Sequence, residues 1–175
     1  MAHPAGLLIA FVVVPLWVAT GFADWACHRA TRIDRTSGLR ENLLHQLMFL
    51  QAGIAVTAMA LLQVNAAVLA IVGAMFLVHE LTVWWDLRVS VPVRAVRPFE
   101  QMVHSFQELL PLVSLLLLAV LAWDAPVDWS LRWKDEPLPP ALLAVGALAV
   151  ALFNALPLAQ ETLACLRARR GLVRP

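Results

Sequence analysis

Residues 65–87 read NAAVLAIVGAMFLVHELTVWWDL, and this stretch decides the fold that we expect. From Asn65 to Val78 it carries no charged side chain, and a helix needs about 20 mostly apolar residues to cross a bilayer. The stretch ends with the ionisable residues His79, Glu80 and Asp86. It therefore predicts a transmembrane helix with a polar site towards one end.

Long apolar runs of this kind recur along the whole chain. Of its 175 residues 61% are hydrophobic, whereas soluble domains are closer to half apolar. We expect an all-α integral membrane bundle that forms a single domain over residues 1–175. Four helices would form a ligand-bearing core, and an almost purely aliphatic fifth helix would pack outside it. The five predicted transmembrane helices cover residues 6–28, 41–64, 65–87, 100–123 and 138–166.

The basic residues predict the orientation. Eleven of the thirteen Lys and Arg residues follow the first, third or fifth helix, and only Arg132 and Lys134 follow the fourth. Because cytoplasmic loops are enriched in Lys and Arg, we expect the N-terminus outside and the C-terminus inside a bacterial inner (cytoplasmic) membrane. The first helix lacks the basic region and cleavage site of a signal peptide, so we expect it to be retained.

Four histidines lie beside acidic residues in four short blocks, one at the same end of each of the first four helices. Residues four apart share a helix face, so the acid and the histidine of one block project together. An up-and-down bundle would bring all four blocks to the cytoplasmic side. The candidate metal ligands, with the choice between Glu80 and Asp86 left open, are Asp24, His28, Glu41, His45, His79, Glu80, Asp86, Glu100, His104 and Glu108.

This set of ligands predicts a metal site with two or more ions. Ionisable groups inside a membrane are costly and are normally paired or functional, and a single zinc ion takes only about four ligands. Mixed imidazole and carboxylate ligands suit iron, manganese or zinc, and we expect iron first. Soluble di-iron bundles also use inward Glu and Glu-x-x-His residues. The spacing here is four residues instead, so only the layout is analogous.

Several segments carry a resemblance to other proteins. They are Ala23-Asp24-Trp25-Ala26-Cys27-His28-Arg29, Thr36-Ser37-Gly38, His79-Glu80, Trp85-Asp86, and Pro98-Phe99-Glu100-Gln101 with His104-Ser105-Phe106. Together they cover roughly residues 20–110 and resemble an uncharacterised family of small bacterial inner-membrane proteins. The resemblance implies a membrane location and brings no established activity with it.

Three functions are compatible with such a site. The first is a dimetal oxidoreductase, most simply di-iron, that acts on an apolar or lipid-like substrate entering from the bilayer. The second is a zinc-dependent lipid hydrolase in which Glu80 or Glu108 acts as general base. The third is a non-catalytic metal-binding or sensor protein. Transport across the membrane is disfavoured because the outer halves of the first four helices are almost entirely aliphatic.

Other readings of the same residues make different predictions. Without metal, the blocks would form an ion-pair network that caps the bundle and draws on Arg29, Arg40, Arg88 and Arg97. Bis-histidine haem is disfavoured because each of the four histidines has a carboxylate neighbour. Glu161, beside the Arg-rich tail, is expected to form an ion pair at the membrane surface. A net charge of +1 does not suggest nucleic acid as a partner, and a homo-oligomer is compatible with the sequence.

Overall fold

The computed structural model describes residues 3–172, and their regular secondary structure is helical apart from one isolated bridge between Leu62 and Trp133. The all-helical prediction is therefore confirmed for these residues. Five helical rods are long and apolar enough to cross a membrane, as predicted. They cover Pro4–Thr31, Leu39–Leu61, Ala66–Ser90, Pro98–Leu121 and Pro140–Gly171.

Two of these rods are built from several helical segments. The first rod consists of α1 (Pro4–Leu8), the π-helical segment η1 (Ile9–Val13) and α2 (Val14–Thr31). The last consists of α6 (Pro140–Val150), the π-helical segment η3 (Ala151–Ala155) and α7 (Leu156–Leu172). Each π segment ends two residues before a proline, Pro15 or Pro157. Because proline has no N–H to donate, the regular hydrogen-bond ladder is interrupted there and a π-bulge takes up the misfit.

The three central rods are single helices with clear starts. The short 3₁₀ segment η2 (Ile33–Arg35) and Gly38, at a φ of 63°, precede α3 (Leu39–Leu61). The side chain of Asn65 caps α4 (Ala66–Ser90) by accepting a hydrogen bond from the Val68 N–H at 3.1 Å. Proline at the first position begins α5 (Pro98–Leu121), where a missing N–H costs no hydrogen bond.

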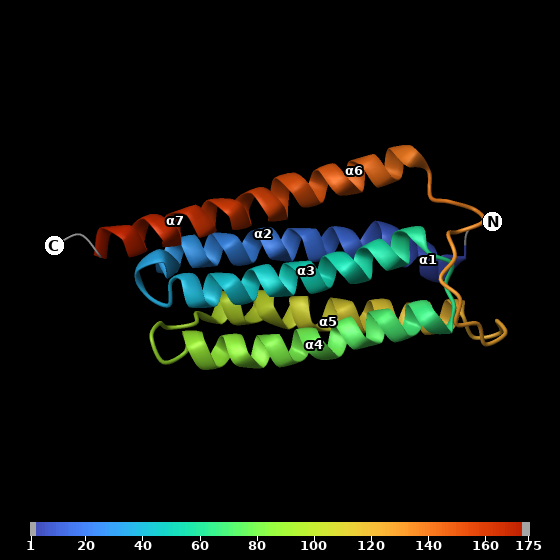
Figure 1. The fold of residues 1–175 in the computed structure, drawn as a ribbon, viewed down its shortest axis with the longest axis horizontal. Coiled ribbons are helices and arrows are strands. Elements are labelled where there is room, and N and C mark those ends of the chain that lie inside the picture. Colours follow the sequence, from blue (N-terminus) through green and yellow to red (C-terminus); the bar gives the residue numbers. More distant parts are fainter. Residues whose placement is uncertain (1–2, 173–175) are drawn as a thin grey trace.

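The rods run up and down, so alternate connections meet at the same end (Figure 1). The α2–α3 and α4–α5 connections lie beside the end of α7, and the α3–α4 and α5–α6 connections lie at the N-terminal end. α3 packs most extensively against α4, and α2 against α5. A buried apolar core occupies the bundle between them and includes Ile9, Ala55, Met59, Val68, Val72 and Leu118.

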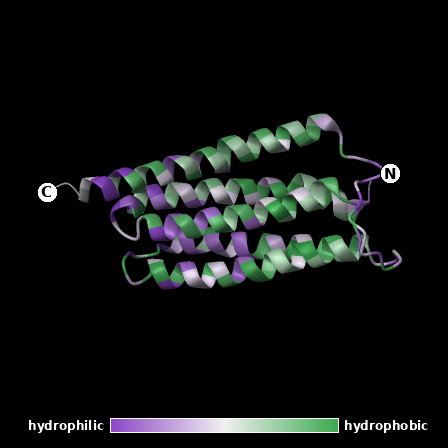
Figure 2. Cartoon of the chain, in the orientation of Figure 1, coloured by the Kyte–Doolittle hydropathy of each residue, from purple (hydrophilic) through white to green (hydrophobic). Residues whose placement is uncertain are grey.

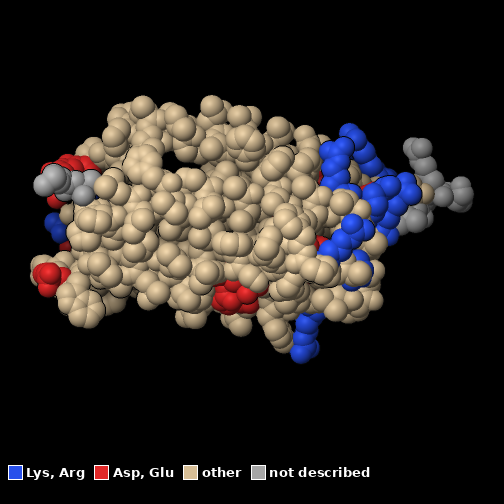
Figure 3. Space-filling view, turned by 180° about the vertical axis from the view of Figure 1, so that it is seen from behind, with Lys and Arg blue, Asp and Glu red and all other residues tan. Residues whose placement is uncertain are grey.

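Polarity is divided between the two ends of the bundle. Hydrophilic residues concentrate towards the end with the α2–α3 connection, whereas the opposite part of the helices is largely hydrophobic (Figure 2). Most Lys and Arg side chains gather at that hydrophilic end, and the middle of the visible face is uncharged apart from one acidic patch at its lower edge (Figure 3). We call this the arginine-rich end.

The fifth rod lies at the side of the bundle. Of its most apolar window only 6% is buried, against 17–33% for the other four rods, and it packs on α2, α3 and η2. Gly21 permits the close approach to α2, because a Cβ there would collide with the side chain of Asn154. The Asn154 amide donates to the Val18 carbonyl at 3.1 Å. The peripheral position matches the prediction, but the fifth rod also reaches the polar interior.

Candidate metal centre

A cluster of buried polar side chains fills the bundle near the arginine-rich end. Seven of the predicted ligands meet there, and they come from four different helices. Two residues outside the predicted ligand set join them, one from the α4–α5 connection and one from α7. We call this group the polar cluster, and it consists of Asp24, His28, Glu41, His45, Asp86, Arg94, Glu100, His104 and Glu161.

One half of the cluster lies between α2 and α5. His104 Nε2 lies 2.9 Å from Asp24 Oδ1, and His28 Nε2 lies 3.3 Å from the same oxygen. Glu100 Oε1 is 3.7 Å from His28 Nε2. One ligand atom from each of these four residues can be chosen so that all lie within 4.8 Å of one another. That spacing is compact enough for the four residues to coordinate a single ion.

The other half lies between α3 and α4. His45 Nε2 is 3.5 Å from Asp86 Oδ1 and 3.8 Å from Glu41 Oε1. His28, Glu41 and His45 form a second group whose potential ligand atoms lie within 4.8 Å of one another. The rings of His28 and His45 stack in parallel, with centroids 4.3 Å apart and an angle of 6° between their planes. His28 therefore stands between the two halves.

Glu161 of α7 contacts both histidines at their Nδ1 atoms. Its Oε2 lies 3.2 Å from His28 Nδ1, its Oε1 lies 3.2 Å from His45 Nδ1, and Asn42 donates to Oε1 at 2.9 Å. The side chain is buried, so the predicted ion pair with the Arg-rich tail is wrong. The period of α7 turns Glu161 inward, towards the bundle and away from the tail. A carboxylate that accepts both Nδ1–H groups turns each Nε2 towards the other acids.

Arg94, in the connection between α4 and α5, closes the cluster from the arginine-rich end. Its Nη2 lies 2.5 Å from Glu41 Oε1 and 2.6 Å from Glu100 Oε1. Burial alone would lower the pKa of Arg94, but the bonds to these two carboxylates raise it above its usual value. The guanidinium is therefore permanently charged. Arg94 is not among the arginines named above for a capping network. The sequence pattern does not show which way a side chain in this connection points.

The cluster contains more acceptors than donors. It holds one guanidinium, that of Arg94, which contacts Glu41 and Glu100, and five carboxyl groups, those of Asp24, Glu41, Asp86, Glu100 and Glu161. His28 Nε2, Asp86 Oδ1 and Glu100 Oε2 are buried without a hydrogen-bond partner. If Nδ1–H of His28 donates to Glu161, a neutral imidazole points its Nε2 lone pair at carboxylates. This arrangement requires extra protons, on the histidines or on the carboxyl groups, or a cation between Nε2 and the acids.

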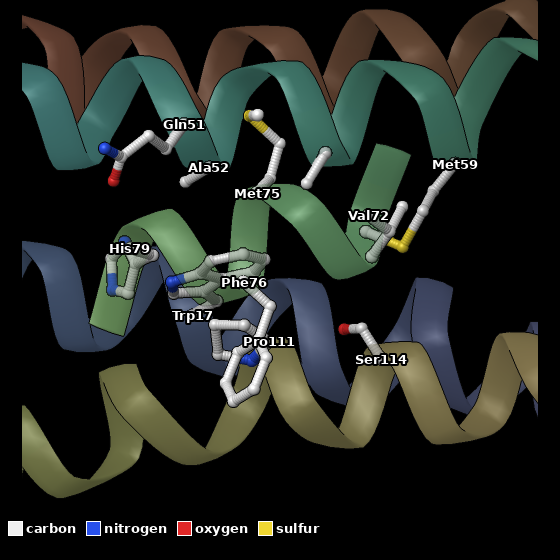
Figure 4. A pocket seen from close by; sticks show the side chains of 11 residues that line it. Trp17, Gln51, Ala52, Met59, Val72, Met75, Phe76, His79, Pro111 and Ser114 are labelled. Carbon is white, nitrogen blue, oxygen red and sulfur yellow. The ribbon is translucent and has the colours of Figure 1, made fainter. Parts of the chain in front are cut away.

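Three predicted ligands lie away from the cluster. His79 is 7% exposed, and neither of its ring nitrogens has a hydrogen-bond partner. It faces a cavity shared with Gln51 (Figure 4). Glu80 and Glu108 are partly exposed on the sides of α4 and α5. His79 and Asp86 are seven residues apart and share a face, but two turns of helix separate them, so only Asp86 reaches the cluster.

Comparison with known proteins adds no functional information. No protein-family model, curated protein or solved structure matches the chain.

Proposed function

We propose that this protein is a metalloprotein of the bacterial inner membrane that binds two divalent metal ions in the polar cluster. The observation that carries the proposal is the position of Glu161, whose two oxygens meet Nδ1 of both His28 and His45. Metal-binding histidines commonly donate their second ring N–H to a carboxylate, which fixes the tautomer and leaves the other nitrogen free for the metal. Here one carboxylate would do this for two histidines.

The charge of the cluster supports two ions. Five ionised carboxylates and one guanidinium leave four negative charges while the histidines are neutral, and two divalent cations would neutralise them. Asp24, Glu100 and His104 would hold one ion, and Glu41, His45 and Asp86 the other. His28, which reaches both groups, would complete one of the two ligand sets. Neutralisation would offset the cost of burying so many acids within a membrane protein.

The ligand types favour a redox role. Imidazole with several carboxylates suits iron, manganese and zinc, and iron would allow electron transfer to or from a substrate. The lateral surface of the bundle is apolar and faces lipid in the proposed setting, so the substrate class is an apolar or lipid-like molecule that enters from the bilayer. A zinc-dependent hydrolase receives less support, because the proposed general bases Glu80 and Glu108 lie outside the cluster.

Elemental analysis of detergent-purified protein tests the proposal. We expect about two metal equivalents per chain for this kind of site, with iron as the main metal. A His45→Ala/His104→Ala variant should lose them. The matched control is His79→Ala, which removes a buried histidine outside the cluster and should retain the metal.

The outcomes separate the alternatives. Two equivalents of zinc in place of iron would replace the oxidoreductase with a hydrolase or a structural centre. Metal that persists in the double variant would place the site elsewhere. A well-folded wild type that contains no metal, and binds none on addition of Fe²⁺, Mn²⁺ or Zn²⁺, would contradict the proposal and leave a purely structural ion-pair network.

A further inference from the structure

A small, partly open cavity lies between α2, α3, α4 and α5. Figure 4 shows Gln51 and His79 on one side of it, with Trp17, Phe76 and Met75 nearby. Its volume, measured with a water-sized sphere, is about 10 Å³. A cavity needs roughly 10–15 Å³ by this measure to hold one water molecule. The available space therefore matches a single small polar group.

One side-chain acceptor at the cavity, the Gln51 amide oxygen, lacks a hydrogen-bond donor. The Gln51 amide nitrogen donates to Thr82 Oγ1 at 3.0 Å, and the Thr82 hydroxyl donates to the Val78 carbonyl at 2.8 Å. These bonds orient the Gln51 amide and leave its Oε1 as a buried acceptor without a donor. Gln51 is only 4% exposed, and leaving such a group unsatisfied costs about 1–3 kcal/mol.

His79 adds a second incomplete group to the same cavity. Both of its ring nitrogens are buried and lack partners, and a neutral imidazole offers one donor and one acceptor. Ser114 also lines the cavity, but its hydroxyl already donates to the Leu110 carbonyl at 3.0 Å. The cavity thus presents an acceptor from Gln51 and one donor and one acceptor from His79. Trp17 and Ser114 also line it, and they have an indole N–H donor and a hydroxyl oxygen that can still accept.

These groups define the chemistry of a ligand that fits. It must donate to Gln51 Oε1, so ligands that only accept hydrogen bonds, such as ketones and dioxygen, do not fit. None of the lining residues is Asp, Glu, Lys or Arg, so a cation would lack a counter-charge and an anion would find one only on a protonated His79. A hydroxyl group both donates and accepts and is uncharged. We propose that this cavity is a binding site for one hydroxyl group, supplied by water or by the end of a small apolar alcohol.

The hydroxyl site is independent of the proposed metal centre. Thr82 lies one helical turn from Asp86, and His79 lies a further turn away on the same side of α4. The polar groups of α4 consequently continue inward from the cluster, but the unsatisfied atoms of His79 and Gln51 need no metal. Binding of a hydroxyl group in the cavity therefore does not depend on metal binding.

Radiolytic footprinting tests the site in nanodiscs. A short X-ray pulse converts bound water into hydroxyl radicals, which oxidise adjacent side chains that mass spectrometry then identifies. Met75 lines the cavity and lies closer than Met59 to Gln51 and His79 (Figure 4), so it reports on water bound there. We expect oxidation of Met75 in the wild type, reduced several-fold in Gln51→Leu/His79→Phe. Both replacements remove polar groups while keeping apolar volume, which is close to neutral for stability.

The controls and a second arm make the result decisive. Gln107→Leu changes a partly buried glutamine of α5 outside the cavity and should leave Met75 oxidation unchanged, and the half-exposed Met102 reports the radical dose. Added 1-butanol should protect Met75 if the site accepts an alcohol, whereas unchanged oxidation would assign it to water alone. Equal oxidation of Met75 in the wild type and the double variant would overturn the inference.

Discussion

Glu161 links the fifth rod to the polar cluster, because it contacts three buried side chains on two other helices. It accepts from Asn42, and it orients His28 and His45 through their Nδ1 atoms. Asn42 is itself within 3.4 Å of the Gln46 amide, which also donates to Thr162 at 2.8 Å. The fifth rod is thereby joined to α3 through several side-chain hydrogen bonds.

Glu161→Gln should weaken metal binding by about 10- to 100-fold, as is typical when a residue behind a metal-binding histidine is replaced. The amide keeps the shape of the carboxylate, but it can no longer accept from both histidines. Competition with a chelator measures the change in affinity. Glu136→Gln, in the exposed α5–α6 connection, is the matched control and should not alter it. An unchanged affinity in Glu161→Gln would remove Glu161 from the centre.

Arg94→Met should lower the free energy of unfolding of the metal-free protein by about 3–5 kcal/mol, the usual cost of breaking a buried ion pair by removing one partner. Glu41 and Glu100 would then lack their only guanidinium partner in the cluster. Denaturant unfolding in detergent measures the difference, with the exposed Arg97→Met as control. A divalent metal should restore part of the loss in Arg94→Met. An equal effect of both substitutions would contradict the role of Arg94.

The helical period explains which residues of the cluster could be predicted. Asp24 with His28 and Glu41 with His45 are four residues apart, so each pair had to share a face. Period alone does not fix the rotation of a helix about its own axis. For that reason the pattern groups Glu80 and Glu108 with the cluster, although both are only partly buried and lie away from it. The roles of Arg94 and Glu161 depend on a connection and on a rod whose packing the sequence pattern does not reveal.

At the scale of helices, the contact between α2 and the fifth rod positions Glu161. At Gly21 the side chain of Asn154, in the π-helical segment η3, fills the space that a Cβ would occupy. The five long helices could be predicted because their apolar runs and the proline at Pro98 mark them clearly. The π segments could not, since a π-bulge depends on how the chain adjusts around Pro15 and Pro157.

Gly21→Leu should separate the fifth rod from α2 and destabilise the protein by about 1–3 kcal/mol, as expected for overpacking of a well-packed contact. The displacement would also move Glu161, so metal affinity should fall together with stability. Gly146→Leu is the matched control, because nothing lies within 4 Å of a Cβ at that position. Thermal unfolding and metal titration of both variants measure the effects. Equal stability and equal metal affinity of Gly21→Leu and Gly146→Leu would show that a side chain at Gly21 does not overpack the contact.

At the scale of the whole molecule, charge is distributed unequally between the two ends (Figure 3). The α5–α6 connection lies across the opposite end, where Gln63 N–H donates to the Arg132 carbonyl at 2.9 Å and Lys134 Nζ donates to the Met59 carbonyl at 2.8 Å. In the proposed membrane setting the positive-inside rule places the arginine-rich end, and with it the polar cluster, in the cytoplasmic half.

Cysteine labelling in intact cells tests this orientation. In a Cys27→Ser background the remaining Cys165 is buried, so an added cysteine would be the main reactive thiol. Ser130→Cys, in the exposed α5–α6 connection, should react with a membrane-impermeant maleimide from outside. Thr36→Cys, at the arginine-rich end, should react only after the cells are opened. The reverse pattern would invert the predicted topology.

The contribution of the last rod to the polar cluster also determines when the cluster can be completed. The seven proposed ligands lie in the first four rods and Glu161 lies in the last, so the complete cluster forms only when the fifth rod has docked. In the proposed setting, four helices would already be inserted while His28 and His45 still lacked the carboxylate that orients them. Tight metal binding would therefore follow the docking of the fifth rod.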